Sequence, residues 1–285
     1  MDKKKIKELE LFAAEIRLET TKEVAKRGFG HLPGSLSVAD ALAVLYGDVM
    51  RIRPKEPKWE GRDLMVMSKG HAGPAVYATL ALKGFFPMEE LATLNQPGTN
   101  LPSHCDRNKT VGVDMTTGSL GQGVSTAIGM ALGHKLAGDD VRTYLIVGDG
   151  ECDEGQVWEG MLFAHQQKLD HLTVFVDYNK KQLDGTVEEV MDLGDIEAKF
   201  KAFGFHTENI DGNNVAAILE ALAKCREVKD VPSCIILNTL KGKGITEVEE
   251  MKLNHHIQVD PELAKKAIAE LTAEVERLKG ETANV

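Results

Sequence analysis

The sequence predicts an α/β protein with a mostly parallel sheet flanked by helices, and with extra helices at both ends. Short apolar runs occur at 144–147, 172–176 and 235–237, and two segments with helical patterns, 155–169 and 215–225, separate them. This alternation is typical of βαβ units and therefore of a parallel sheet. Helical patterns also occupy both ends of the chain, outside the alternating part.

The first predicted helix covers residues 3–27, and a glycine-rich stretch that starts at Gly28 ends it. A second helix is expected after Ser37, because Asp40 follows three residues later as in a capping box. The apolar run at 64–68 is then the first of the short buried segments. These elements come before the alternating part of the chain.

Residues 121–137 are rich in small side chains, which predicts a helix packed closely on its neighbours. A last helix should begin at Asp260, with Pro261 at its first position. Its apolar residues share one face: Leu263, Ile268, Leu271, Val275 and Leu278. We find no internal repeat, so we expect one α/β domain at 1–258 with a helix appended at 259–285.

Composition limits the function classes. The 285 residues carry a formal net charge of −10, which argues against a nucleic-acid binder but leaves a small phosphorylated ligand possible. No apolar run is long enough for a membrane helix, and the charged start of the chain is unlike a secretory signal. Four cysteines without paired spacing indicate neither a disulfide framework nor a zinc site. The expected location is the cytoplasm.

Asp149 stands between two glycines directly after the apolar run at 144–147. Asn179 follows the next apolar run, 30 residues later, which is about one strand-helix-strand crossover. If the two strands are neighbours, both side chains reach the same sheet edge, where ligands of parallel sheets bind. Their oxygens suit Mg²⁺ or Ca²⁺, and such an ion could hold a diphosphate. The alternative, in which Gly-Asp-Gly is only a tight turn, stays open.

The segment GDGECDEGQVWEGMLFAHQQKLDHLTVFVDYNKKQLDG resembles the thiamine-diphosphate motif of the transketolase family. The likeness extends upstream to GHLPGSLS (30–37), SKGHAGPAVY (68–77) and GVDMTTGSLGQG (112–123). It extends downstream to LKGKGI (240–245) and a histidine at 255. Several distinctive motifs in family order are far more specific than any one of them.

The resemblance implies a thiamine-diphosphate-binding fold, with residues 1–258 as the diphosphate-binding domain. It implies that thiamine diphosphate is the cofactor and that Mg²⁺ or Ca²⁺ is its metal. The implied metal ligands are Asp149, Asn179 and the main-chain carbonyl of Lys181. The residues implied to contact the cofactor are His71, Gly118, Leu120, Asp149, Gly150, Asn179 and Lys181.

Among nine histidines, four fall on family positions: His31, His71, His104 and His255. The resemblance implies that they stabilise developing oxyanions and move protons on the substrate, which suits a group whose pKa lies near neutrality. Glu154 resembles the acid that contacts an activating glutamate across the interface with a second domain. His256 rivals His255 for the same role.

Some positions depart from the usual family pattern. Leu32 separates the first histidine from Pro33, Asn254 stands where Trp is common, and a second histidine replaces Gly after His255. HCD also replaces the commoner His-Pro-Glu after His104. These changes lie around the substrate entrance, so they leave the identity of the sugar open.

The implied activity is the transfer of a two-carbon ketol unit from a ketose phosphate to an aldose phosphate. Because the activating glutamate of the family lies in a second domain, the chain is expected to be the N-terminal subunit of a two-chain transketolase. Its partner would be a C-terminal subunit carrying the pyrimidine-binding domain, in an α2β2 assembly that is active only as a complex. The alternatives are a deoxyxylulose-phosphate-synthase-like enzyme, a 2-oxoacid dehydrogenase alpha-type enzyme and a non-catalytic relative.

Overall fold

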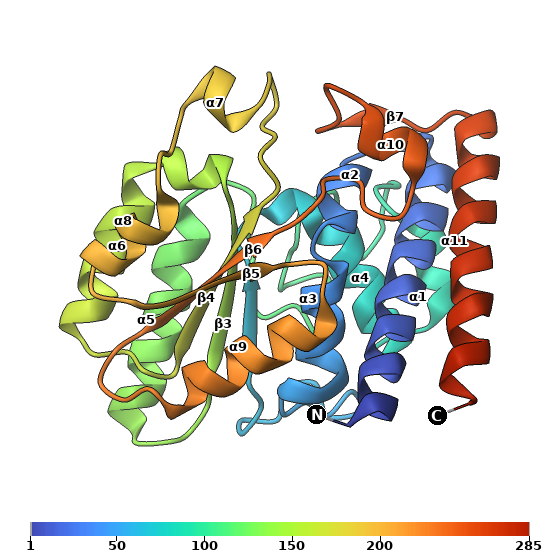
Figure 1. Ribbon diagram of the computed structural model, residues 1–285. Coiled ribbons are helices and arrows are strands. Elements are labelled where there is room, and N and C mark those ends of the chain that lie inside the picture. Colours follow the sequence, from blue (N-terminus) through green and yellow to red (C-terminus); the bar gives the residue numbers. More distant parts are fainter. Residues whose placement is uncertain (1, 285) are drawn as a thin grey trace.

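Five parallel strands form the central sheet of the computed structural model, which describes residues 2–284 (Figure 1). Their order is β2-β3-β4-β6-β5. Their bounds are β2 Leu64–Met67, β3 Thr143–Gly148, β4 Leu172–Tyr178, β5 His206–Asp211 and β6 Ser233–Asn238. A separate antiparallel pair joins β1 (Phe29–Gly30) to β7 (Ile257–Gln258).

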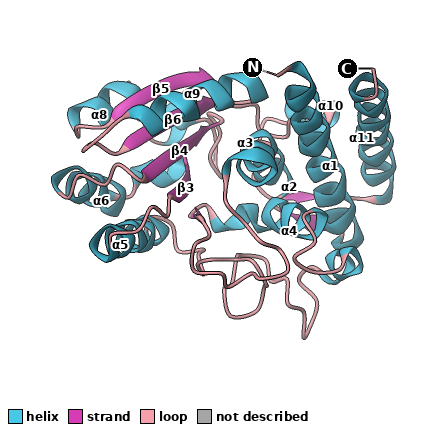
Figure 2. Ribbon diagram, turned by 90° about the horizontal axis from the view of Figure 1, so that it is seen from below, coloured by secondary structure: helices cyan, strands magenta, loops and turns pink. Residues whose placement is uncertain are grey.

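Helices cover both faces of this sheet. The helices are α1 Lys3–Arg27, α2 Leu32–Leu36, α3 Ala39–Val44, α4 Gly73–Leu82, α5 Gln122–Ala137, α6 Gly155–Gln166, α7 Val187–Val190, α8 Ile196–Ala202, α9 Val215–Glu227, α10 Thr246–Glu250 and α11 Pro261–Thr282. Figure 2 shows α5 and α6 on one side of the sheet, and α1, α3 and α11 on the other. The predicted α/β class, with a parallel sheet and extra helices at both ends, is confirmed.

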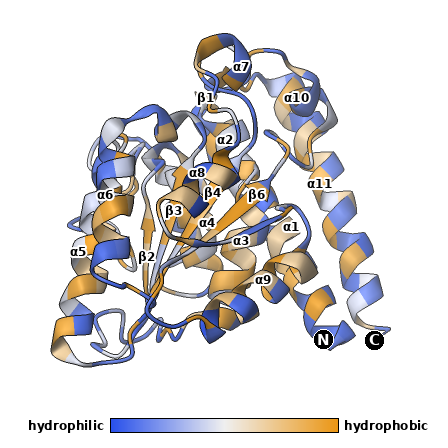
Figure 3. Cartoon of the chain, turned by 60° about the vertical axis from the view of Figure 1, so that its left-hand side comes forward, coloured by the Kyte–Doolittle hydropathy of each residue, from blue (hydrophilic) through white to orange (hydrophobic). Residues whose placement is uncertain are grey.

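The side chains of β3 alternate between two hydrophobic cores. Tyr144 and Ile146 belong to the core beneath α1, α3, α4 and α9, whereas Leu145 and Val147 belong to the core beneath α5 and α6. All six residues of β3 are buried. A strand buried on both faces reads as a continuous apolar run, which is why it was visible in the sequence (Figure 3).

The strands at 64–68, 144–147, 172–176 and 235–237 are confirmed within one or two residues. β5 was not predicted, because it has the polar sequence HTENID and no fully buried side chain. β5 lies at the sheet edge and pairs with β6 alone. Its polar, partly exposed side chains leave no apolar run in the sequence, whereas β2, at the other edge of the sheet, is fully buried and was visible as one.

The expected helix cap at Ser37 is wrong. Ser37 closes α2 instead of opening the next helix, and α3 begins at Ala39 without a side-chain cap. The Ser37 hydroxyl donates a hydrogen bond to Asp177 Oδ2 at 2.8 Å. The cap pattern was misleading because a distant buried carboxylate uses the hydroxyl.

The two terminal helices lie side by side, α11 along α1 (Figure 1). Asp260 caps α11 as predicted, and its carboxylate accepts from the backbone N–H groups of Glu262 and Leu263. Within residues 2–284 no helix is both long enough and apolar enough to cross a bilayer. All four cysteines are free and buried.

Candidate active site

The carboxyl ends of β3 and β4 bring the two predicted ligands together. Gly148 lies opposite Asp177 in the parallel register, and the Asp149 N–H donates to the Asp177 carbonyl at 3.2 Å. Asp149 and Asn179 therefore emerge at the same sheet edge. Both line a cavity of about 210 Å³, together with Lys181.

Asp149 is 3% exposed. Its Oδ1 accepts from the Gly150 N–H at 2.8 Å and its Oδ2 from the Lys180 N–H at 2.6 Å. Burial first, and then the charge of Asp177, raise the pKa of this carboxyl to about 6. Asn179 donates from Nδ2 to Asp177 Oδ2 at 2.8 Å, which fixes the direction of the amide and leaves its Oδ1 as an acceptor.

The third oxygen of this group is the carbonyl of Lys181, which accepts a hydrogen bond from Lys241 Nζ at 2.6 Å. Lys241 is 2% exposed, and burial, together with the charge of Lys69, lowers its pKa to about 8. Within residues 2–284 no cluster of three His, Cys, Asp or Glu side chains could hold a metal. A carboxylate, an amide oxygen and a carbonyl are nevertheless hard ligands, and the carbonyl already accepts from the Lys241 ammonium. This donor set fits a divalent ion such as Mg²⁺.

A buried ion pair beneath the cavity supports these residues. The side chains of Lys69 and Asp177 are 1% and 0% exposed, and the ammonium donates to Asp177 Oδ2. Burial acts to raise the pKa of Asp177, but the ion pair with Lys69 outweighs it, and the pKa falls below its ordinary value. Thr239 also donates to this carboxylate, and Lys69 donates to the Gly34 carbonyl at 2.8 Å. Asp177 thereby orients Asn179.

Lys69, Asp177 and Lys241 were not singled out from the sequence. Lys69 lies inside the quoted motif SKGHAG, and Lys241 inside LKGKGI. Nothing local separates Lys241 from Lys243 two residues later. Only the burial of Lys69, Asp177 and Lys241, and the hydrogen bonds that they make, distinguish these residues from their neighbours in the sequence.

The four histidines on family positions, and the rival His256, form one cluster. The His31 ring centroid lies 5.4 Å from that of His71, 5.7 Å from His104, 5.2 Å from His255 and 4.7 Å from His256. His71 and His255 are 4.7 Å apart and both line the cavity that holds Asp149. The predicted histidines are therefore brought together, with His31 at their centre.

Burial favours the neutral form of the four imidazoles on family positions, His31, His71, His104 and His255. It lowers the pKa of His31 to about 4 and that of His255 to about 3, and nearby histidines and Lys241 add to both shifts. The pKa of His71 lies well below its ordinary value, and burial also lowers the pKa of His104. Each ring therefore offers one N–H donor and one lone pair at neutral pH.

The β1–β7 pair explains how distant histidines meet. Gly30 lies opposite Ile257, so His31 follows one strand while His255 and His256 precede the other. The Val259 N–H also donates to the Gly28 carbonyl at 2.8 Å. This short sheet joins the first and last of the quoted motifs across more than two hundred residues of sequence.

The loop before α5 closes the cavity. Leu120 lines the cavity, and Gly118 has a φ of 142°, with the His104 ring 3.3 Å from where a Cβ would lie. Glu151, which was also not predicted, is 2% exposed and accepts from the N–H groups of Gly121 at 2.9 Å and Gly148 at 3.1 Å. Glu151 thereby ties this loop to the end of β3.

Glu154 lies apart from the cavity. It is exposed at the start of α6, and its side chain makes no capping hydrogen bond. Its Cβ lies 3.1 Å from where a Cβ on Gly121 would be, so it borders the same loop from outside. The other four histidines, at positions 134, 165, 171 and 206, do not belong to the cluster.

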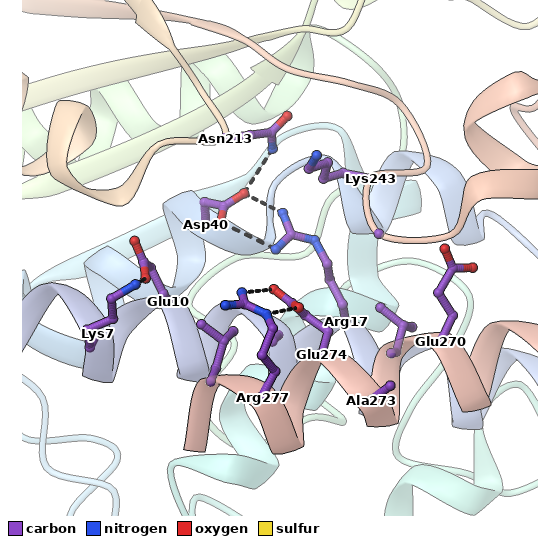
Figure 4. Close-up of a pocket in the computed structure, with 14 residues that line it drawn as sticks. Lys7, Glu10, Arg17, Asp40, Asn213, Lys243, Glu270, Ala273, Glu274 and Arg277 are labelled. Carbon is purple, nitrogen blue, oxygen red and sulfur yellow. Dashed lines mark hydrogen bonds and ion pairs between the residues drawn. The ribbon is translucent and has the colours of Figure 1, made fainter. Parts of the chain in front are cut away.

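A larger cavity, of about 640 Å³, contains none of the predicted site residues and lies where α11 passes α1 and α3 (Figure 4). At its wall Arg17 pairs with Asp40, which also accepts from Asn213 Nδ2 at 2.8 Å. Asn213 Oδ1 in turn accepts from the Leu240 N–H at 2.9 Å. This chain of contacts holds the backbone immediately before Lys241.

A parallel sheet with an oxygen-lined pocket and a histidine cluster at its carboxyl edge defines the class: the cofactor-binding part of an α/β enzyme. The family model described as "Transketolase, thiamine diphosphate binding domain" matches residues 9–273. The chain belongs to the transketolase family.

Two relatives are separate subunits of similar length. The 6-deoxy-6-sulfo-D-fructose transketolase subunit SqwG of Clostridium sp. (strain MSTE9) is 51% identical over 91% of this chain and 94% of its own length. An apulose-4-phosphate transketolase subunit of Phocaeicola vulgatus is 36% identical over 97% of this chain and 98% of its own length.

Full-length transketolases match over less than half of their length. Human transketolase is 34% identical over 98% of this chain but only 44% of its own. The Campylobacter jejuni transketolase structure superposes with a TM-score of 0.86 at 29% identity, covering 100% of this chain and 48% of that one. The structure of a Pichia stipitis transketolase mutant superposes with a TM-score of 0.86 at 28% identity, covering 97% of this chain and 44% of that one. The chain is thus an N-terminal transketolase subunit that carries the thiamine-diphosphate-binding domain, and the prediction of two-carbon ketol transfer as a split subunit is confirmed.

Proposed function

We propose that this subunit holds the diphosphate of thiamine diphosphate through Mg²⁺, with Ca²⁺ as the alternative ion. The ligands would be the Asp149 carboxylate, the Asn179 amide oxygen and the Lys181 carbonyl. The observation that carries this proposal is that all three residues line one cavity, which the histidine cluster also borders. Magnesium in proteins typically takes one or two protein carboxylates or similar oxygens together with phosphate oxygens.

The diphosphate would lie against His71, Gly118, Leu120 and Gly150. At Gly150 a Cβ would lie 3.0 Å from the Gln182 side chain, so glycine lets Gln182 pack against the loop that follows β3. Lys241 adds a buried positive charge on the same wall. A metal and one ammonium together would balance much of the charge of a diphosphate.

The cofactor, when bound, carries the two-carbon unit between the donor and acceptor sugars. The chain's own catalytic groups would be His31, His71, His104 and His255. Because each imidazole is held neutral, it can accept a proton from a sugar hydroxyl or donate its N–H to a carbonyl oxygen. His71 and His255 border the cofactor cavity, so they are nearest the reacting end of the sugar.

Two donor sugars are candidates. The 51% identical relative is named for 6-deoxy-6-sulfo-D-fructose, and we propose this sulfonated ketose as the first donor to test. The second candidate is a ketose phosphate, including the pentose phosphates, since the 36% identical relative is named for apulose 4-phosphate. The acceptor would be an aldose phosphate.

The partner we propose is a C-terminal-type transketolase chain with a pyrimidine-binding domain, in an α2β2 heterotetramer. Support comes from an exposed apolar surface on α5 and α6, where Leu136, Leu162 and Phe163 are 79%, 61% and 44% exposed. Glu154 lies at the start of α6, where it could reach the partner's acid. We place the complex in the cytoplasm, which suits four free cysteines. Residues 1–258 would form the cofactor domain and 259–285 its appended helix.

The test measures thiamine diphosphate binding to the reconstituted complex by calorimetry, with and without Mg²⁺. Asp149→Ala should abolish the metal-dependent part of the affinity, whereas Asp48→Ala, at an exposed acid paired with Lys5, should leave it unchanged. Unchanged affinity in Asp149→Ala would remove this residue from the metal site. The lone chain should transfer no ketol units, and substantial activity without a partner would contradict the two-chain assignment.

A further inference from the structure

The turn between β5 and α9, residues 212–214, packs directly on the chain that leaves β6. The Gly212 N–H donates to the Asn238 carbonyl at 2.9 Å. A Cβ at Gly212 would lie 2.5 Å from the Leu237 Cβ, so a side chain there would push the two segments apart. The next residue of the turn, Asn213, therefore carries its side chain to the segment that follows β6.

Asn213 uses both ends of its side-chain amide. Its Oδ1 accepts from the Leu240 N–H at 2.9 Å, and its Nδ2 donates to Asp40 Oδ2 at 2.8 Å. The partners require this orientation of the amide, because a backbone N–H only donates and a carboxylate only accepts. Asn213 thus bridges α3, which carries Asp40, to Leu240, the residue immediately before Lys241.

A buried ion pair fixes the Asp40 end of this bridge. The Arg17 guanidinium donates to both carboxylate oxygens of Asp40, and the two residues are 8% and 5% exposed (Figure 4). Because both oxygens are held, the carboxylate cannot turn away from Asn213. Its negative charge also strengthens the hydrogen bond that it accepts from the amide. The bridge therefore reaches from α1 through α3 to the chain after β6.

Lys241 is also held from the side that follows it in the chain. The Gly242 N–H donates to the Pro33 carbonyl at 3.0 Å, and Asn254 Nδ2 donates to the Lys241 carbonyl at 3.3 Å. The Lys241 ammonium itself donates to the Lys181 carbonyl at 2.6 Å. These contacts fix the backbone after Lys241, so the position of the ammonium also depends on what fixes the backbone before it.

We propose that Asn213 is a positioning residue for cofactor binding: it fixes the backbone before Lys241 and so places the Lys241 ammonium at the cavity that would hold the diphosphate. Asn213 lines the larger cavity and not the one that holds Asp149, so it acts without touching the cofactor. This inference rests on the proposed function, since it takes the ammonium to face the bound diphosphate. A displaced ammonium binds a phosphate oxygen less well, because both the hydrogen bond and the charge attraction weaken with distance.

The test measures the affinity of the two-chain complex for thiamine diphosphate by calorimetry in the presence of Mg²⁺. Asn213→Ala should lower this affinity about tenfold, and Lys241→Met should lower it at least as much. The double variant Asn213→Ala/Lys241→Met should bind no more weakly than Lys241→Met, because Asn213 acts only through this lysine. In ketol-transfer assays Asn213→Ala should raise the KM for thiamine diphosphate about tenfold, while kcat at saturating cofactor stays within about twofold.

Asn214→Ala is the matched control. The Asn214 side chain accepts from the Ala217 N–H at 3.1 Å and so caps α9. Both Asn213→Ala and Asn214→Ala should lower the midpoint of thermal unfolding, but only Asn213→Ala should lower the affinity for thiamine diphosphate. The same loss of affinity in Asn214→Ala would show that any loosening of this turn is enough, and it would overturn the positioning role.

The outcomes separate this inference from the proposed function. If the unmodified complex binds no thiamine diphosphate, or if Lys241→Met binds it as tightly as the unmodified complex, the proposed function fails at this site and the inference fails with it. If Lys241→Met weakens binding but Asn213→Ala does not, the inference alone is wrong. The inference is also wrong by itself if the two losses add in the double variant, because Asn213 would then act by another route.

Discussion

Replacing Lys69 with Met should strongly destabilise the protein, because it leaves the Asp177 carboxylate charged and buried. The two side chains are 1% and 0% exposed, so water cannot replace the lost ammonium. Removing one partner of a buried ion pair typically costs about 3–5 kcal/mol. Asp177 keeps its hydrogen bonds from Ser37, Asn179 and Thr239, so we expect the lower end, about 3 kcal/mol.

The assay is urea unfolding followed by circular dichroism, from which the free energy of unfolding is obtained. The control is Lys201→Met, which breaks an exposed i,i+4 pair with Glu197 and should leave the free energy of unfolding almost unchanged. The double variant Lys69→Met/Asp177→Asn removes both charges and should recover about 2 kcal/mol of the loss. A cost below about 1 kcal/mol for Lys69→Met, or strictly additive losses in the double variant, would refute the reasoning.

Two further predictions concern stability. Glu23 is 2% exposed, neither of its carboxylate oxygens has a hydrogen-bond partner within residues 2–284, and burial raises its pKa well above the ordinary value. Above the ordinary pKa of a glutamate the folded state therefore holds a proton that the unfolded state has lost, so the free energy of unfolding falls as pH rises. Glu23→Gln should remove up to about 1.4 kcal/mol of this loss per pH unit. An equal pH dependence of the free energy of unfolding in the variant and the unmodified protein would contradict this prediction. On α5, a Cβ at Gly123 would lie 2.3 Å from Ser68 Oγ, whereas Gly129 has nothing within 4 Å. Thermal unfolding should show Gly123→Ala destabilised by about 1–3 kcal/mol and Gly129→Ala stabilised by about 0.5–1 kcal/mol, and a shift of the same sign in both would argue against this packing.

The meeting of Asp149 and Asn179 at one cavity was predictable because it depends on two local patterns. Each buried strand is visible as an apolar run, and each run ends at the side chain of interest, Asp149 or Asn179. The carboxyl ends of two neighbouring parallel strands lie at the same edge of a sheet. Because β3 and β4 pair in parallel, Asp149 and Asn179 meet at that edge. The histidine positions were predicted from the likeness to a family, and the structure brings them together through β1 and β7, two strands of two residues each that have no apolar pattern of their own.

The sequence by itself determined the α/β class, the buried strands, the helices at both ends and the residues to inspect, because burial on a regular element leaves a periodic pattern. Only the tertiary structure decided that β5 is a strand, that Ser37 serves Asp177 instead of a helix, and that Lys241 approaches the Lys181 carbonyl. It also decided that Arg27 stacks on Phe29, whose ring lies 5.6 Å from that of His256. These outcomes depend on polar groups whose partners lie far away along the chain, and no local pattern records which distant group satisfies a buried charge or hydrogen bond.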